Sequence, residues 1–515
     1  MIDITQLLIL GVVMGLGYFM FDGSRHDPRE PPLVISGIPI LGHIFGILWH
    51  GVNHWGNQAK KHPRQPIISL DMFFTKFYVI TSPDLMQAVQ RNAKTLSLEP
   101  LLFFSAKNIS GISNKRTLNI LKERDAGGEG LSSKILHAMT PALSGKALDK
   151  MNIQMIQLLQ PFIDKLGEGK SGESSMFDLY EWCKDATIAA STEAIYGPMN
   201  PYKDKVIRDG WWDFETGLTM LMANTLPWLT ARKAWKGRRR ATNAILKYFQ
   251  DGGHIQASEL TTMRFNISLE SGFTLEEYSK LEVGTLLGLV SNTIPAMFWC
   301  LFDLYYRQKL LDEIREEIQG NALIIATDGT YRIDLTAIRE QCPLLLSTFQ
   351  EILRTRTNSA PTRLVLKDTL LADKYLLKAG NTVSIVSELV ARHPKVWGET
   401  SEVFNERRFM NSGEKKESRR VGGFLTFGLS PTVCPGRHFA SSEILLLVAM
   451  VILRYDVSPV GGVWKEPKIA ASMVSIMGPI KGKFLVEASA RKEYAGIKWG
   501  FHVEEGKGQF PLVIG

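Results

Sequence analysis

The stretch from Thr274 to Tyr306 constrains the fold more than any other part of the sequence. It reads TLEEYSKLEVGTLLGLVSNTIPAMFWCLFDLYY. Thr274 and Glu277 have the spacing of a capping box, and the middle of the stretch is apolar around nearly every side of a helix. Its polar start and Pro295 make it a poor membrane span. We therefore expect a long helix buried through the centre of the protein, kinked or opened by Pro295.

The rest of the chain fits one large core around this helix. Its 515 residues are 45% hydrophobic and 22% charged, which is ordinary for a globular protein, and we find no internal repeat. The pattern is mostly helical over 115–349, with breaks near 127–130, 167–172 and 252–253. Strand-like runs are few: 67–80, 382–386 and short pieces after residue 455. The expected fold class is mainly α with small β-sheets.

The N-terminus carries a candidate membrane anchor. Ile4 to Phe21 holds no charge, and its length as a helix, about 27 Å, just spans a bilayer. The absence of a basic region before it and of a small-residue cleavage site after it favours a retained anchor over a cleaved signal peptide. We expect an anchor at 1–22, a proline-rich strap (or a plain linker) at 23–45, and a catalytic domain at 46–515. Basic residues after the anchor place that domain in the cytosol.

The net charge of +8 suits an anionic membrane surface or an acidic partner protein. The charge is too diffuse to indicate nucleic-acid binding, so no nucleic-acid partner is expected. The basic stretch ARKAWKGRRR, residues 231–240, follows an apolar patch at 226–229. It is either a solvated helix face or a contact with the membrane surface.

Cys434 is the cysteine that points to chemistry. The four cysteines are far apart, which argues against a zinc cluster or a disulfide framework. Cys434 lies in FGLSPTVCPGRHFA, just before a helix that begins near Arg437. The positive N-terminal end of that helix favours a thiolate.

Two further motifs precede this loop in a fixed order. Glu351 and Arg354 lie three residues apart and share a helix face, which alone could be an ordinary salt bridge. Arg408 follows in FNERRF, where Glu406 stands in place of a more usual proline. In this order and spacing, the motifs resemble those of the cytochrome P-450 family, microsomal type.

The resemblance implies the cytochrome P-450 fold with an N-terminal transmembrane helix, and a haem (iron protoporphyrin IX) whose axial ligand is the Cys434 thiolate. Phe427 and Gly436 would complete the haem loop, and Glu351, Arg354 and Arg408 would lock the region beneath the haem. The loop departs from the common pattern at Ser430, where glycine is usual, and at Thr432, where a basic residue usually meets a propionate.

The resemblance also suggests other haem contacts. Arg363 lies near the position of a propionate-binding arginine in related enzymes. Lys134 and His137 lie where the family often has a Trp-x-x-x-Arg propionate binder, although that motif is absent here. For each of these residues, an ordinary surface or satisfied polar role is an equal alternative.

The oxygen-activating side is unusual. Ser291 and Asn292 occupy the positions of the family's acid–alcohol pair, and Thr293 follows. The stretch SNTIPAMFW resembles the branch of cholesterol 7α-hydroxylase, sterol 12α-hydroxylase and prostacyclin synthase. We predict that Asn292, with Ser291 and Thr293, serves the proton relay; alternatively, Asn292 only satisfies backbone opened by Pro295.

The resemblance implies a monooxygenase of the endoplasmic reticulum membrane, single-pass with a cytosolic catalytic domain. It would use O2 and electrons from NADPH through NADPH-cytochrome P-450 reductase. The expected substrate is large and lipophilic, a sterol or polycyclic terpenoid of a fungal secondary-metabolite pathway. Two alternatives stay open: a haem-thiolate isomerase or dehydratase acting without a reductase, and a non-catalytic haem binder.

Overall fold

A computed structural model describes residues 26–36, 42–72, 75–124, 129–167, 175–410, 422–506 and 508–512. The expected anchor at 1–22 lies outside the described residues, and the strap at 23–45 lies partly outside them. The described part of the strap is not a free linker. It contributes strand β1 (Leu33–Val34), and its last residues begin helix α2 (Gly42–His50).

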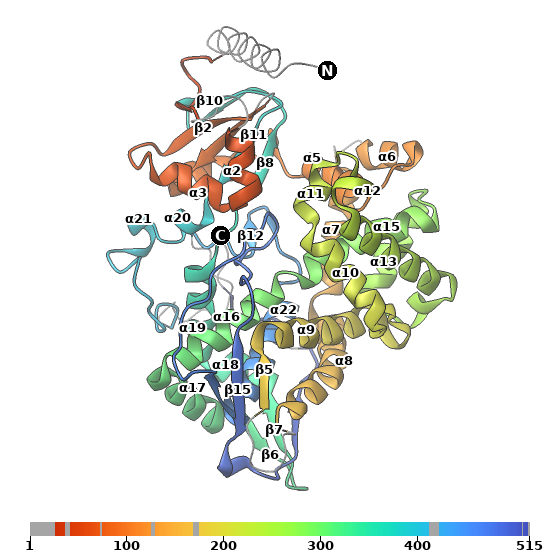
Figure 1. The fold of residues 1–515 in the computed structure, drawn as a ribbon, viewed down its shortest axis with the longest axis vertical. Coiled ribbons are helices and arrows are strands. Elements are labelled where there is room, and N and C mark those ends of the chain that lie inside the picture. The colour runs from red at the N-terminus through yellow and green to blue at the C-terminus, as the bar shows by residue number, and fades with distance from the viewer. Residues whose placement is uncertain are drawn as a thin grey trace, which may run out of the picture.

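One mixed sheet of six strands gathers the first and last thirds of the chain (Figure 1). Its order is β1, β2 (Ile67–Met72), β3 (Thr75–Ile80), β11 (Thr382–Ile385), β8 (Thr362–Val365) and β4 (Leu96–Ser97). β1 pairs with β2 and β3 pairs with β11 in parallel, whereas the other neighbours are antiparallel. Helices α2 and α3 (Asn53–Lys60) lie with this sheet at one end of the molecule.

The remaining strands form four small sheets. Two have three strands: β14 (Tyr455–Pro459), β15 (Leu485–Ala490) and β5 (Ser175–Asp178); and β16 (Trp499–His502), β7 (Tyr331–Asp334) and β6 (Leu323–Ile325). Two are hairpins: β9 (Thr369–Leu371) with β10 (Tyr375–Leu377), and β12 (Gly428–Leu429) with β13 (Thr432–Val433).

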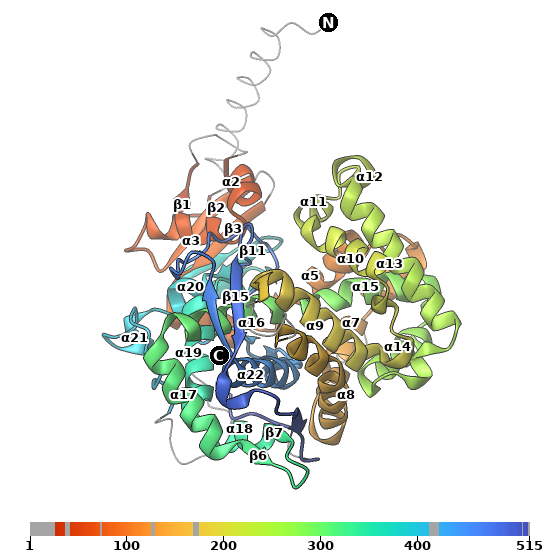
Figure 2. The same ribbon diagram turned by 60° about the horizontal axis from the view of Figure 1, so that its bottom comes forward.

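Helices make up the rest of the body, and Figure 2 shows them grouped beside the six-stranded sheet. Those before the central helix are α4 (Pro83–Arg91), α5 (Glu99–Phe104), the π-helix η1 (Ser105–Ile109), α6 (Lys115–Lys122), α7 (Leu131–Ala142), α8 (Gly145–Asp164), α9 (Leu179–Tyr196), α10 (Lys205–Thr216), α11 (Leu218–Ala223), α12 (Pro227–Thr230), α13 (Arg232–Gln250) and α14 (Glu259–Glu270). Those after it are α17 (Gln308–Asn321), α18 (Leu335–Gln341), α19 (Pro343–Arg356), α20 (Ser387–Val390), α21 (Pro394–Trp397) and α22 (Arg437–Arg454).

The central helix is confirmed, including its interruption. It runs as α15 (Leu275–Val290) and α16 (Thr293–Tyr306), separated at Ser291 and Asn292. Pro295 explains the break, because it has no N–H to donate to the carbonyl of Ser291, four residues earlier. Every residue of α16 before Tyr306 is buried, and α16 packs against α9, α19 and α22. Within the described part of the chain, this stretch is the one helix apolar and long enough to cross a membrane, and most of it is buried inside the protein.

The N-terminal cap of α15 is only half of the expected capping box. Thr274 Oγ1 accepts a hydrogen bond from the backbone N–H of Glu277 at 3.3 Å. The Glu277 carboxylate, however, turns to Lys280 Nζ at 2.5 Å rather than back to Thr274. An ammonium group one turn away offers a charged partner, which a carboxylate prefers over a neutral N–H.

Candidate active site

A cavity of about 430 Å³ lies between α15–α16 and the loop that carries Cys434. One face of the central helix lines it with residues three or four apart: Leu281, Gly284, Thr285, Gly288, Leu289, Asn292, Thr293 and Ala296. This spacing is the helical period, so a single stripe of α15–α16 faces the cavity. No charged side chain is among the described residues that line it.

The cysteine loop is a tight hairpin. Residues 428–429 pair with residues 432–433, and the turn between them contains a cis Ser430–Pro431 peptide bond. The backbone N–H of Cys434 donates to the carbonyl of Phe427 at 2.7 Å, which closes the hairpin. Gly428 has φ +95°, and a Cβ there would come within 2.9 Å of the Thr432 carbonyl oxygen, so the hairpin needs glycine at this position.

The environment of the Cys434 sulfur combines opposing effects. Burial raises the pKa of the Cys434 thiol, whereas the backbone N–H groups of Gly436 and Arg437 and the Arg437 charge lower that pKa. Gly436 is the N-cap of α22, so these N–H groups belong to the positive end of that helix. Burial outweighs these contributions, so the pKa of the Cys434 thiol is raised overall. The N–H groups and the Arg437 charge offset only part of the cost of an anionic sulfur that faces the cavity, and a coordinated metal cation would supply the rest.

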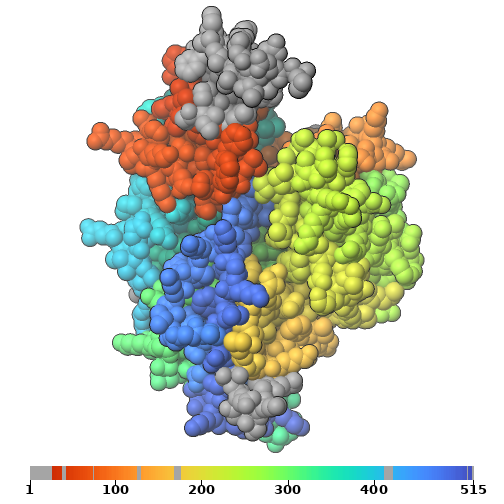
Figure 3. All heavy atoms as spheres, in the orientation of Figure 1, coloured from red at the N-terminus to blue at the C-terminus, as the bar shows by residue number. Residues whose placement is uncertain are grey.

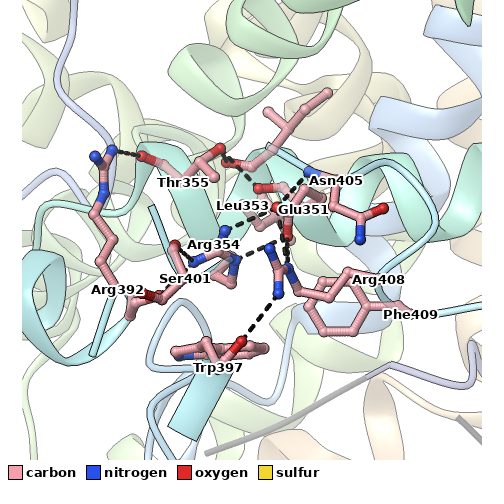
Figure 4. A network of polar contacts seen from close by, with 12 residues as sticks. Glu351, Leu353, Arg354, Thr355, Arg392, Trp397, Ser401, Asn405, Arg408 and Phe409 are labelled. Carbon is pink, nitrogen blue, oxygen red and sulfur yellow. Dashed lines mark hydrogen bonds and ion pairs between the residues drawn. The ribbon is translucent and has the colours of Figure 1, made fainter. Parts of the chain in front are cut away.

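Behind the loop lies a buried charge network (Figure 4). Arg354 donates to both carboxylate oxygens of Glu351 at 2.8 Å, and Arg408 Nε lies 3.1 and 3.2 Å from the same two oxygens. The backbone N–H of Asn405 also donates to Glu351, at 2.9 Å. Arg354 further donates to the carbonyls of Ala391 and Ser401. The network thus ties α19 to the chain between α20 and residue 409.

Asn292 is held rigidly at the helix break. Its Oδ1 accepts the backbone N–H of Ile476 at 2.9 Å, which assigns the amide orientation because an N–H can only donate. The amide nitrogen has no hydrogen-bond partner among the described residues and belongs to a side chain that lines the cavity. Asn292 therefore offers a fixed donor at the wall opposite the cysteine loop.

The sequence profile of the family described as cytochrome P450 matches residues 31–486. The chain belongs to the cytochrome P450 family.

Relatives in the same family cover between 72% and 99% of this chain. The cytochrome P450 monooxygenase nodJ of Hypoxylon pulicicidum is 40% identical over 99% of this chain and 100% of its own length. More distant relatives include cytochrome P450 7B1 of Mus musculus, 23% identical over 87% of this chain and 89% of its own, and 25-hydroxycholesterol 7-alpha-hydroxylase of Rattus norvegicus, 25% identical over 72% and 90%. The chain is a cytochrome P450 monooxygenase, and its resemblance to fungal and steroid-hydroxylating members is confirmed.

Membership of the cytochrome P450 family implies a haem with a cysteine thiolate ligand, and the cavity fits this group. A Cβ on Gly436 would meet only the Cys434 sulfur, at 3.9 Å, so the space beside the sulfur is left open by glycine. Arg363 is 7% exposed, and burial lowers its pKa to about 10. Among the described residues, its guanidinium donates to the carbonyls of Thr362 and Leu429 and pairs with no carboxylate, so a propionate would supply a counter-charge.

Three expected haem contacts are not among the described residues that line this cavity: Arg363, Lys134 and His137. Lys134 and His137 lie on the exposed side of α7, and His137 pairs with Glu129 at 2.6 Å. The opposite side of the same helix, with Ser132, Ile135 and Met139, lines the cavity. An α-helix turns about 100° per residue, so a small error in position changes which face a residue occupies. Because the tryptophan and arginine of the family motif are absent here, the sequence did not establish which face of α7 is directed inward.

Ser291 also differs from its expected place. Its hydroxyl is buried with no hydrogen-bond partner, and Ser291 is not among the described residues that line the cavity, whereas Asn292 and Thr293 are. The helix break turns neighbouring residues in different directions, which an alignment of the acid–alcohol positions does not reveal.

One wall of the cavity is formed by residues that the sequence patterns do not predict. Ser105, Ala106 and Ser110 line it from η1 and the residue after it, and Ile476 and Met477 line it from the loop before β15. Gly284 on α15 was the available signal, because glycine in a helix permits close approach of another segment, and a Cβ there would come within 2.0 Å of Ser110 Oγ.

Proposed function

We propose that the chain holds a haem through Cys434 and oxidises a large, neutral, lipophilic substrate with O2. The observation that carries this proposal is the cavity wall, which joins Cys434 to an apolar helical stripe and contains no charged side chain among its described residues. Burying a charge without a partner costs several kcal/mol, so such a cavity favours neutral ligands. A thiolate-ligated haem supplies the oxygen-activating chemistry when it is bound.

The protein's own residues would prepare this chemistry. Cys434 is presented by its hairpin with N–H groups directed at the sulfur, and Phe427 covers the same loop. Asn292 would donate a hydrogen bond from its fixed amide and, with Thr293, position the protons that oxygen cleavage consumes. Arg363 would pair with a propionate, and Glu351, Arg354 and Arg408 would hold the backbone behind the loop.

The substrate is proposed to be a sterol or polycyclic terpenoid in a fungal biosynthetic pathway. Support comes from the named relatives: one is a monooxygenase of a fungus, and one is called 25-hydroxycholesterol 7-alpha-hydroxylase. A rigid polycyclic skeleton also suits a long apolar wall, because it loses little conformational entropy when bound.

Residues 1–22 are proposed to anchor the protein in the endoplasmic reticulum membrane, with NADPH-cytochrome P450 reductase as electron donor. Exposed apolar side chains support a membrane on this side: Leu48 and Trp49 on α2, and Trp228 and Leu229 on α12. In Figures 1 and 2, α2 and α12 lie toward the same end of the molecule, and Figure 3 shows the first helices and the helices around α12 sharing that end of the surface.

Membranes from cells that express the chain with the reductase test this proposal. Neutral sterols and polycyclic terpenoids incubated with them should gain oxygen only when NADPH and O2 are both present. Cys434→Ser should abolish the product, and Cys342→Ser, which changes a buried cysteine outside the cavity lining, should not. Product formed without NADPH or reductase would contradict the monooxygenase proposal and indicate an isomerase or dehydratase.

A further inference from the structure

The π-helical turn η1 forms one wall of the cavity, which the sequence patterns do not predict. In η1, the Ser110 N–H donates to the Ser105 carbonyl at 3.0 Å, and the Ile112 N–H donates to the Ala106 carbonyl at 3.1 Å. A Cβ on Gly284 would come within 2.0 Å of Ser110 Oγ, so this turn lies directly against α15. Single π-helical turns recur at functional sites, because they place side chains where an α-helix would not.

Arg238 holds the end of this turn from α13. Its Nη1 donates to the carbonyls of Asn108 and Ile109 at 3.1 and 2.8 Å, which are the last carbonyls of η1 and have no partner within the helix. Burial lowers the pKa of Arg238, and no carboxylate among the described residues pairs with it. A Cβ on Gly111, where φ is +80°, would come within 2.8 Å of the guanidinium carbon. Arg238, one of the cations of the basic stretch 231–240, therefore binds backbone carbonyls inside the protein and does not contribute to a charged surface.

Asn108 joins the same turn to the connection between α11 and α12. Asn108 is 8% exposed; its Nδ2 donates to the Met222 carbonyl at 3.3 Å, and its Oδ1 accepts from Asn224 Nδ2 at 3.2 Å. Asn224 and Leu226 have φ of +49° and +45°, in the left-handed region. Asparagine tolerates that region, but leucine there is strained, so the surrounding contacts must enforce the conformation.

We propose that Arg238 and Asn108 are positioning residues that fix the η1 wall of the cavity and thereby determine how large ligands are held. Without the guanidinium, two buried carbonyls lose their donor and the turn must rearrange. Ser105, Ala106 and Ser110 then move relative to α15. This inference rests on the proposed function, because it takes the cavity to be the substrate site.

Imidazoles that bind the haem iron test this role without turnover. Imidazole itself reaches only the space near the iron, whereas 1-dodecylimidazole must also fill the rest of the cavity. In the full-length holoprotein, Arg238→Met should weaken 1-dodecylimidazole at least about tenfold and imidazole less than about twofold, measured by optical titration. Arg239→Met is the matched control: Arg239 is the next residue of α13, is exposed, and should leave both affinities unchanged.

Asn224→Gly gives a second test that a folding defect in Arg238→Met cannot obscure. Glycine keeps the left-handed backbone but removes the amide that donates to Asn108, so it should also weaken the long probe selectively. Unchanged selectivity in Asn224→Gly, or equal loss of both probes in Arg238→Met, would overturn the positioning role. If the wild-type reduced carbonyl complex lacked a thiolate spectrum, the haem proposal itself would fail instead.

Discussion

Glu351 is a buried carboxylate that pairs with two arginines and also accepts a backbone N–H. It is 0% exposed, and its two oxygens receive Arg354, Arg408 and the Asn405 N–H. Removing these charges from water costs free energy. The cost is offset because nearly every donor and acceptor in the network has a hydrogen-bond partner. The network therefore fixes the positions of the backbone segments behind the cysteine loop. Removing one member leaves the charges of the others without a counter-charge.

Glu351→Gln should lower the stability of the fold by about 3–5 kcal/mol, because the buried Arg354 and the half-buried Arg408 both lose their counter-charge. Glu402→Gln is the control, since Glu402 pairs with Arg392 at an exposed position and should change stability by less than about 0.5 kcal/mol. Denaturant unfolding followed by the haem band measures both. Equal stability of the two variants would contradict a structural role for Glu351.

Glu443 is a second single residue that affects stability, and its effect should depend on pH. It is fully buried on α22; one oxygen accepts from Ser191 Oγ at 2.7 Å, and the other has no hydrogen-bond partner in the part of the chain that the structure describes. Burial raises the pKa of Glu443 from 4.5 to about 8. The folded protein therefore retains a proton that the unfolded chain releases. This contribution to stability is complete below about pH 4.5 and is lost as the pH rises toward 8.

Glu443→Gln should remove that pH dependence, because glutamine stays neutral. Between about pH 5 and pH 9, the wild type should lose up to a few kcal/mol more stability than the variant. Unfolding midpoints across this range make the comparison. Parallel curves for the two proteins would show that Glu443 does not titrate as its burial requires.

At the scale of elements, the position of the break between α15 and α16 was predicted well from the sequence. The directions of the side chains at this break were not. Pro295 predicts where the hydrogen-bond ladder opens, because the missing N–H is a property of the residue itself. Which of Ser291, Asn292 and Thr293 turns toward the cavity depends on the Ile476 loop, which lies far along the chain. The half-formed capping box has the same origin, since Lys280 competes for Glu277.

Asn292→Ala and Ser291→Ala should separate the two neighbours at this break. Asn292→Ala loses both the cavity donor and the tie to the Ile476 N–H, so product formation per NADPH consumed should fall at least about tenfold. Ser291→Ala removes a buried hydroxyl that has no partner among the described residues. It should leave turnover within about twofold while raising stability by up to about 1 kcal/mol. A larger loss of turnover in Ser291→Ala than in Asn292→Ala would reverse this assignment.

At the scale of the whole molecule, the fold class and the loop that carries Cys434 could be predicted from the sequence. The wall of the cavity formed by η1 could not. The central helix and the runs at 67–80 and 382–386 are local patterns, and the structure has helices and strands there as expected. The structure also brings Arg408 to Glu351 and places Cys434 at the cavity. Short strands such as β5 and β7 were missed, because pairing with distant strands decides them. Likewise, η1 depends on Arg238, more than a hundred residues later.

We expect Cys434 to provide the thiolate that binds the haem iron. The reduced carbon monoxide complex of the full-length protein tests it most directly. We expect the strongly red-shifted Soret band of a thiolate-ligated haem in the wild type and in Cys342→Ser, and its loss in Cys434→His. A histidine-type band in the wild type, or an unchanged thiolate band in Cys434→His, would contradict the account.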